Sequence, residues 1–170
     1  MSTFALALDL DENWFDNKIN KHITNFSVIH YPGQKDISVM PNQLRAGAHS
    51  DYGSLTIVNT NTDIGGLEVL NANREWETVP WLPDAFVVNL GDLMAEWTND
   101  RWKSTMHRVI NPPIEKAHLS KTSMTFFHQP NYDAVIECIP TCVSQKNPAK
   151  YGKTTSGEHV TMKINKHRDV

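Results

Sequence analysis

The stretch AHSDYGSLTIV, residues 48–58, places a His and an Asp two positions apart in a run of β-branched and aliphatic residues. The pattern predicts an extended strand, in which residues i and i+2 project from the same face. His49 and Asp51 would then point to the same side as Leu55 and Ile57, which suggests that this side faces the interior. Burying a carboxylate beside an imidazole costs free energy unless the two are hydrogen-bonded or bind a cation. The stretch therefore predicts either a hydrogen-bonded pair or a metal site.

The His-x-Asp motif alone is too short to decide between these two interpretations. The chain contains 8 His in 170 residues, so such a spacing arises readily by chance. A second example, His167 to Asp169, lies in a charged C-terminal segment, and we interpret it as accidental. A metal site therefore needs a further ligand elsewhere in the chain.

Length and composition are those of a globular protein with one domain, which we expect to span residues 1–170. The chain is 39% hydrophobic and 21% charged, and it is long enough to bury a core. The net charge is −3, and the 16 Lys and Arg are scattered without a basic block. This distribution argues against nucleic acid and membrane as partners and favours a small-molecule substrate.

The N-terminal residues and the cysteines both bear on the cellular compartment. The start, MSTFALALDLDENWF, lacks the basic flank and cleavage pattern of a signal peptide, and no apolar run reaches the length of a membrane span. We therefore expect a cytoplasmic protein. Cys138 and Cys142 fit that compartment as reduced thiols, because their spacing in CIPTC differs from that of a CxxC zinc or redox site.

Short runs of β-forming residues alternate with turn-forming clusters over most of the chain. We expect strands within residues 26–31, 43–58, 66–70, 76–80, 85–90, 107–110 and 121–129. A short helix is expected over residues 11–22, a helical turn within 91–102, and a final helix from Ser156 with Glu158 in its first turn. Many short strands without long intervening helices predict a mostly β sandwich, barrel or jelly roll.

A third ligand candidate, His107, lies in the segment STMHRVINPP. Alternation there places Thr105, His107 and Val109 on one face. Two His and one carboxylate, with coordination positions left open, form the facial triad of non-haem Fe(II) oxygenases. The alternative for His107 is an ordinary surface or hydrogen-bonded histidine.

Four longer segments follow one another in order: LRAGAHSDYGSLTIV, GGLEVLN, WETVPWLPDAFVVNLGDLMAEWTNDRWKSTMHRVINPP and TSMTFFHQPNYDAVI. Together they resemble the iron- and 2-oxoglutarate-dependent oxygenases of the isopenicillin N synthase-like superfamily. The resemblance implies a double-stranded β-helix, a distorted jelly roll, with a short N-terminal and a C-terminal helix. It implies that His49, Asp51 and His107 are the iron ligands. It also implies a dioxygenase that uses Fe(II), 2-oxoglutarate and O2 to hydroxylate, desaturate or cyclise a small organic molecule.

The family holds the distal carboxylate of 2-oxoglutarate with an Arg-x-Ser motif, and this chain has Lys121 and Ser123 in that place. The two positions share a strand face, so a cation and a hydroxyl still converge on one site. Lys lacks the bidentate fork of Arg, so a 2-oxoglutarate-independent oxidase of the same superfamily stays open. Tyr31 matches a family tyrosine that contacts the co-substrate. Arg45 shares parity with His49 and could hold an anionic substrate group or lie in solvent.

Members of this superfamily usually carry a long N-terminal region, and this chain starts near the core. We therefore expect a catalytic domain without that region, whose uncovered apolar surface and sheet edges would favour self-association. Two interpretations from other classes stay open. One is a metal-binding jelly roll of cupin type, and the other is a non-catalytic remnant that binds a partner through its exposed sheet.

Overall fold

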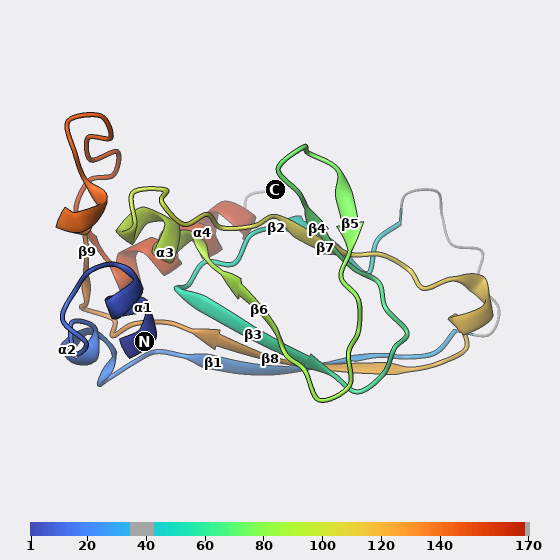
Figure 1. Cartoon of the computed structure of the whole chain (residues 1–170). Helices are drawn as coiled ribbons and strands as arrows, with labels where there is room; N and C mark the ends of the chain where they lie inside the picture. The colour runs from blue at the N-terminus through green and yellow to red at the C-terminus, as the bar shows by residue number, and fades with distance from the viewer. Residues whose placement is uncertain (35–42, 169–170) are drawn as a thin grey trace.

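Two four-stranded antiparallel sheets face each other in the computed structural model, which describes residues 1–34 and 43–168 (Figure 1). The first sheet contains, in spatial order, β1 (Asn25–Tyr31), β8 (Lys121–His128), β3 (Leu55–Thr60) and β6 (Val87–Leu90). The second contains β2 (Ala46–His49), β7 (His107–Val109), β4 (Leu67–Leu70) and β5 (Trp76–Thr78). A small sheet pairs β10 (Thr154–Thr155) with β9 (Val135–Ile136). Two facing antiparallel sheets built from strands distant in sequence form a jelly roll, so the predicted fold class is confirmed.

The single strand expected over residues 43–58 is wrong, because the structure divides it between the two sheets. β2 ends at His49 and β3 begins at Leu55 in the opposite sheet. The crossing segment is packed tightly: a Cβ at Gly53 would lie 2.5 Å from the His128 carbonyl oxygen, and one at Gly91 would lie 2.2 Å from the Gly53 carbonyl oxygen. Glycine permits this close approach of three backbone segments. The face that includes His49 consequently does not continue along β3.

The four α-helices collect at one end of the sheets, whereas the short 3-10 turn of residues 114–116 lies at the other end (Figure 1). The α-helices are α1 (Ser2–Ala7), α2 (Asp16–Ile19), α3 (Asp92–Trp97) and α4 (Ser156–Arg168), and the 3-10 helices are η1 (Ile114–Lys116) and η2 (Pro140–Cys142). α3 confirms the expected helical turn, and α4 starts at Ser156 with Glu158 in its first turn, as predicted. In the described part of the chain, no helix is both long enough and apolar enough to cross a membrane. Of the second His-x-Asp motif, Asp169 lies outside the described residues.

The helix expected over residues 11–22 is reduced to the single turn of α2. It is preceded by α1, which the sequence pattern did not predict. The Asp11 carboxylate accepts a hydrogen bond from the backbone of Asn13 at 2.9 Å, which closes a turn rather than capping a helix. Phe15 is fully buried, with its ring centroid 5.3 Å from that of Trp97. Tertiary packing of these aromatic rings thus overrides the local helical pattern.

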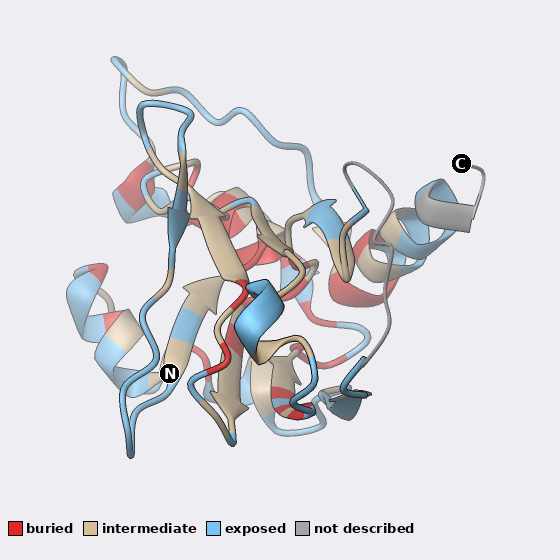
Figure 2. Ribbon diagram, turned by 90° about the vertical axis from the view of Figure 1, so that its right-hand side faces the viewer, coloured by how far each residue is buried: buried red, intermediate tan, exposed pale blue. Residues whose placement is uncertain are grey.

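The buried apolar core lies at the helical end rather than between the two sheets. Strands in Figure 2 are largely intermediate or exposed, whereas buried residues gather in helices and loops. The core cluster consists of Ala5, Leu8, Phe15, Leu93, Met94, Trp97, Ile136, Ile139 and Cys142. Anchoring the fold at one end leaves room for a cavity between the sheets.

Candidate metal centre

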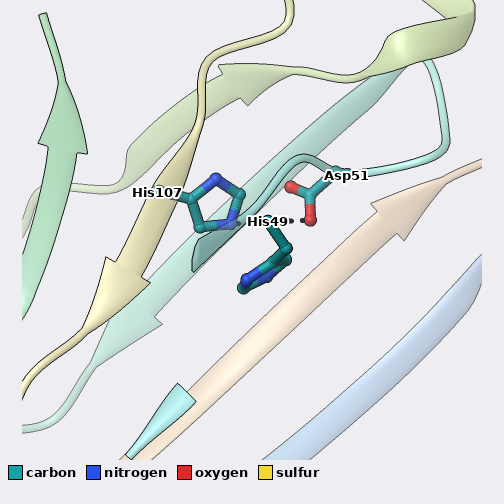
Figure 3. Close-up of side chains that lie close together, drawn as sticks. All are labelled: His49, Asp51 and His107. Atoms are coloured by element: carbon teal, nitrogen blue, oxygen red, sulfur yellow. Dashed lines mark ion pairs between the residues drawn. The ribbon is translucent and has the colours of Figure 1, made fainter. Parts of the chain in front are cut away.

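Three side chains predicted as metal ligands converge on one point between the sheets (Figure 3). One ligand atom from each of His49, Asp51 and His107 lies within 4.8 Å of the others. The His107 Nε2 atom is 3.6 Å from Asp51 Oδ1, and the two imidazole centroids are 4.3 Å apart. Among residues 1–34 and 43–168, these three form the group of His, Cys or carboxylate side chains that could hold a metal ion.

The backbone explains how residues distant in sequence meet here. His49 at the end of β2 pairs directly with His107 at the start of β7. Asp51 lies in the loop after β2, where its backbone carbonyl accepts a hydrogen bond from Asp92 at the start of α3, at 2.7 Å. The next carbonyl, that of Tyr52, accepts one from Leu93 at 3.2 Å. The α3 N-terminus therefore fixes the loop that presents the carboxylate.

Hydrogen bonds to backbone carbonyls set the tautomer of both histidines. His49 Nδ1 lies 2.7 Å from the Gly47 oxygen, and His107 Nδ1 lies 3.0 Å from the Thr105 oxygen. Because a carbonyl oxygen only accepts, each Nδ1 carries a hydrogen, which leaves Nε2 as the ring nitrogen available to a metal ion. Two imidazoles and a carboxylate gathered in this way offer the nitrogen and oxygen ligands that a transition metal takes. The donor set thus fits a divalent metal ion.

The carboxylate of Asp51 is held by a residue that sequence reasoning missed. Asp51 is 6% exposed, and its Oδ2 atom accepts a hydrogen bond from Asn89 Nδ2 at 2.7 Å. This bond leaves Oδ1 directed toward His107. Asn89 is the polar residue in the otherwise apolar strand β6, and this feature of the sequence could have indicated a functional role. Partners of this kind orient a metal-binding carboxylate.

The C-terminal helix α4 braces the same loop from outside. His159, 1% exposed, places Nε2 3.1 Å from the Tyr52 carbonyl oxygen and Nδ1 3.3 Å from a carboxylate oxygen of Glu96. Lys163 donates a hydrogen bond to Asp92 at 2.6 Å. Burial opposes ionisation of Asp92, but its hydrogen bonds, above all that from Lys163, hold its pKa below the ordinary value. Contacts from α3 and α4 together position the residues that follow His49.

A cavity of about 530 Å³ lies between the sheets and contains the three ligand candidates. It is also lined by Tyr31, Lys121 and Ser123, the residues predicted to hold a co-substrate. Lys121 and Ser123 are 5% and 7% exposed and alternate along β8 with outward residues, so the prediction that both point inward agrees with the structure. Further lining is mostly aliphatic and aromatic, including Ile29, Leu67, Val69, Val87 and Phe127.

The face predicted to continue from His49 along β3 is the wrong one. Thr56 and Val58 line the cavity, whereas Leu55 and Ile57 do not. The segment that crosses between the sheets after His49 resets the alternation. Asp51 reaches the cavity from this loop, not from a strand.

Arg45 does not share the face of His49 as its position suggested. The β2–β7 register shifts between Ala46 and His49, so both of these residues line the cavity although they are three positions apart. Such a β-bulge breaks the alternation of side chains. Arg45 does not line the cavity itself, and its guanidinium carbon lies 5.6 Å from the centroid of the Tyr31 ring.

The two thiols lie away from this centre. Cys142 is buried in the helical core, Cys138 is half-buried, and neither forms a disulfide. The Cys138 sulfur contacts the Asn99 side-chain oxygen at 3.6 Å. Neither cysteine lines the cavity between the sheets.

Comparison with known proteins is consistent with this geometry. The chain is 34% identical over 169 residues to homoarginine-6-hydroxylase 2-ODD-C23 of Glycine max, covering 96% of this chain and 50% of that protein. It is 38% identical over 157 residues to the 2-oxoglutarate-Fe(II) type oxidoreductase hxnY of Emericella nidulans, covering 91% of this chain and 43% of that protein. This chain therefore spans about half the length of the curated relatives that it matches.

Solved structures and a family profile also match this chain. A full-length Neurospora crassa protein crystallised in complex with alpha-KG superposes with a TM-score of 0.90 at 34% identity, over 97% of this chain and 51% of that chain. A putative 2OG-Fe(II) oxygenase family protein from Caulobacter crescentus gives 0.88 at 30% identity, over 97% and 52%. The profile of the 2OG-Fe(II) oxygenase superfamily matches residues 19–130, a segment that includes all three ligand candidates. The chain belongs to the 2OG-Fe(II) oxygenase superfamily.

Proposed function

We propose that this chain is the catalytic part of an Fe(II)- and 2-oxoglutarate-dependent dioxygenase that oxidises a small organic molecule. The observation that carries the proposal is the convergence of His49, Asp51 and His107 within 4.8 Å, with both Nδ1 atoms engaged by carbonyl oxygens. A facial set of two His and one carboxylate leaves coordination positions for a co-substrate and O2. When bound, the iron supplies the oxidation of the substrate, coupled to conversion of 2-oxoglutarate and O2 to succinate and carbon dioxide.

The side chains of this chain have distinct tasks in that reaction. His49, Asp51 and His107 would hold the iron, and Asn89 would keep the Asp51 carboxylate oriented through its hydrogen bond. The aliphatic and aromatic cavity walls would exclude water from the reacting atoms. The protein thereby contributes geometry and a dry site, while the metal contributes the oxidative step.

The co-substrate would lie with its distal carboxylate against Lys121 and Ser123. Lys121 is nearly fully buried in the same cavity as the triad, and burial lowers the pKa of its ammonium group, as does nearby Arg45. A carboxylate beside this ammonium would relieve both effects. Tyr31 contributes a neutral hydroxyl, because burial raises its pKa above the ordinary value.

Succinate formation tests the proposal. We expect that anaerobic addition of Fe(II) and 2-oxoglutarate gives the weak visible charge-transfer band of the chelate, and that exposure to air then yields succinate. Iron binding without the band, and without succinate, would favour the 2-oxoglutarate-independent oxidase or a cupin-like metal protein. A chain that binds no iron would favour a non-catalytic protein.

We propose a small organic molecule as the substrate and assign no particular compound. The relatives and structural neighbours carry names with different targets, among them homoarginine for the Glycine max protein and thymine in one complex of the Neurospora crassa protein. We propose neither nucleic acid nor membrane as a partner, in keeping with the scattered basic residues. The cytoplasmic location expected from the N-terminal residues stays a prediction.

We also propose that the chain associates with a second copy through the outer face of the β1–β8 pair. Phe26 and Val28 on the edge strand β1 are 60% and 61% exposed, and they pair with Phe126 and Met124 on β8. An exposed apolar face beside a sheet edge favours association. Light scattering of the chain would give a dimer mass, and Val28→Lys would restore the monomer. A monomer mass at high concentration would contradict this proposal.

A further inference from the structure

Two positively charged side chains meet beside the ring of Tyr31. The Lys121 ammonium nitrogen lies 5.8 Å from the ring centroid, and the Arg45 guanidinium carbon lies 5.6 Å from it. Tyr31 pairs with Lys121 across the β1–β8 ladder, whereas Arg45 immediately precedes β2 in the opposite sheet. Both sheets therefore supply a positive charge to the same end of the cavity.

Neither charge is balanced by a carboxylate within residues 1–34 and 43–168, where no ion pair involves Lys121 or Arg45. Lys121 donates instead to the neutral carbonyl oxygen of Gly65 at 2.8 Å. Burial lowers the pKa of Lys121, and the charge of Arg45 lowers it further. Lys121 is buried and Arg45 lies close to it, so the two like charges repel each other, and an anion beside Lys121 removes that cost.

We infer that Arg45 belongs to the co-substrate site, where it is the second positive charge that acts on the distal carboxylate of 2-oxoglutarate. This inference rests on the proposed function and replaces the substrate role suggested by the position of Arg45 in the sequence. Arg45 does not line the cavity, so it acts as a positioning residue from its place beside the Tyr31 ring. Lys121 offers one compact charge without a bidentate fork, and Arg45 strengthens the field at that point.

Ligand pairs that differ only in the distal carboxylate test the inference. Binding of 2-oxoglutarate and of 2-oxopentanoate, which has a methyl group instead of that carboxylate, is measured by calorimetry on the Mn(II)-loaded chain. We expect Arg45→Gln to reduce the preference for 2-oxoglutarate about tenfold, or ~1.4 kcal/mol, and to leave 2-oxopentanoate binding unchanged. Arg45→Lys keeps the charge and should retain most of the preference.

Arg101→Gln is the matched control, because Arg101 is an exposed arginine whose ion-pair partner is Asp9, away from the cavity. It should leave both affinities unchanged. An unaltered preference in Arg45→Gln, or an equal loss for both ligands, would overturn the inference while the proposed function stands. A parent chain that binds Mn(II) but not 2-oxoglutarate would overturn the proposed function, and the inference with it.

Discussion

Replacing Lys121 with Met should weaken 2-oxoglutarate binding and at the same time stabilise the ligand-free chain. Met is unbranched and only one atom shorter than Lys, and it removes the charge, so a bound distal carboxylate would be buried without its ammonium partner. Lys121 is 5% exposed and faces the cavity. Loss of one partner of such a desolvated charge pair costs roughly 2–5 kcal/mol, so the affinity for 2-oxoglutarate should fall at least about thirtyfold.

The effect on stability has the opposite sign. The pKa of Lys121 is lowered in the folded chain, by burial first and by Arg45 second. The folded state therefore binds fewer protons than the unfolded state as pH approaches the ordinary lysine pKa, and at neutral pH the buried charge opposes folding. Removing that charge should raise the melting temperature at neutral pH. It should also remove the gain in stability that the parent chain shows on moving to alkaline pH.

Anaerobic titration of the charge-transfer band with 2-oxoglutarate, together with thermal melts of the ligand-free chain, measures both effects. Lys103→Met is the matched control, because Lys103 is an exposed lysine at the rim of the same cavity. It should change neither quantity appreciably. Undiminished affinity in Lys121→Met would refute the assignment of this residue, and a melting temperature that falls together with affinity would refute the account of its buried charge.

Three further predictions concern other parts of the molecule. Asn89→Ala removes the hydrogen bond to Asp51 and should lower Fe(II) affinity by roughly 10–100-fold, which a competition titration with a chromophoric chelator would detect or exclude. Burial lowers the pKa of His128 to about 4, so the unfolded chain takes up protons first and stability is lost as pH falls below 6.5. His128→Gln should reduce that loss between pH 7 and 5 by about 1 kcal/mol, allowing for partial exposure. Urea unfolding of the parent and the variant at both pH values measures this difference, and an equal loss of stability in the two chains would mean that the pKa of His128 is ordinary. Replacing Cys138 with Ser and Cys142 with Ala should leave Fe(II) affinity unchanged, since neither thiol lines the cavity, and a clear drop in metal titrations would contradict this.

Chemistry that depends on local sequence could be predicted well. The spacing of His49 and Asp51, the later His107, and the shared parity of Lys121 and Ser123 indicated which side chains meet in the cavity. A ligand set needs particular residue types, and these stand out in runs of β-forming residues. The family resemblance added the order in which the segments occur.

Features that depend on long-range contacts could not be predicted from the local sequence. Alternation predicts one continuous strand through His49 and Ile57, but Gly53 and Gly91 approach other backbone segments so closely that the chain crosses between sheets there. The bulge before His49 likewise turns Arg45 away from the cavity. Both departures arise from partners that lie far along the chain, and no local pattern encodes them.

The helical end of the molecule shows the same limit. Phe15 and Trp97 pack together although they are distant in sequence, and this contact shortens the helix expected around Phe15. His159 and Lys163 of α4 reach back to the loop around Asp51 through Tyr52 and Asp92. The sequence around His159 and Lys163 does not indicate that these residues contact Tyr52 and Asp92.

Equilibrium binding of Fe(II) under anaerobic conditions tests the central claim most directly. The parent chain should bind one Fe(II), and His49→Ala, Asp51→Ala and His107→Ala should each abolish stoichiometric binding, because each removes one of three ligands. Circular dichroism should be the same for all four chains, since these residues lie outside the apolar core. Absence of Fe(II) binding by the parent chain, or undiminished binding by any of the three folded variants, would contradict the account.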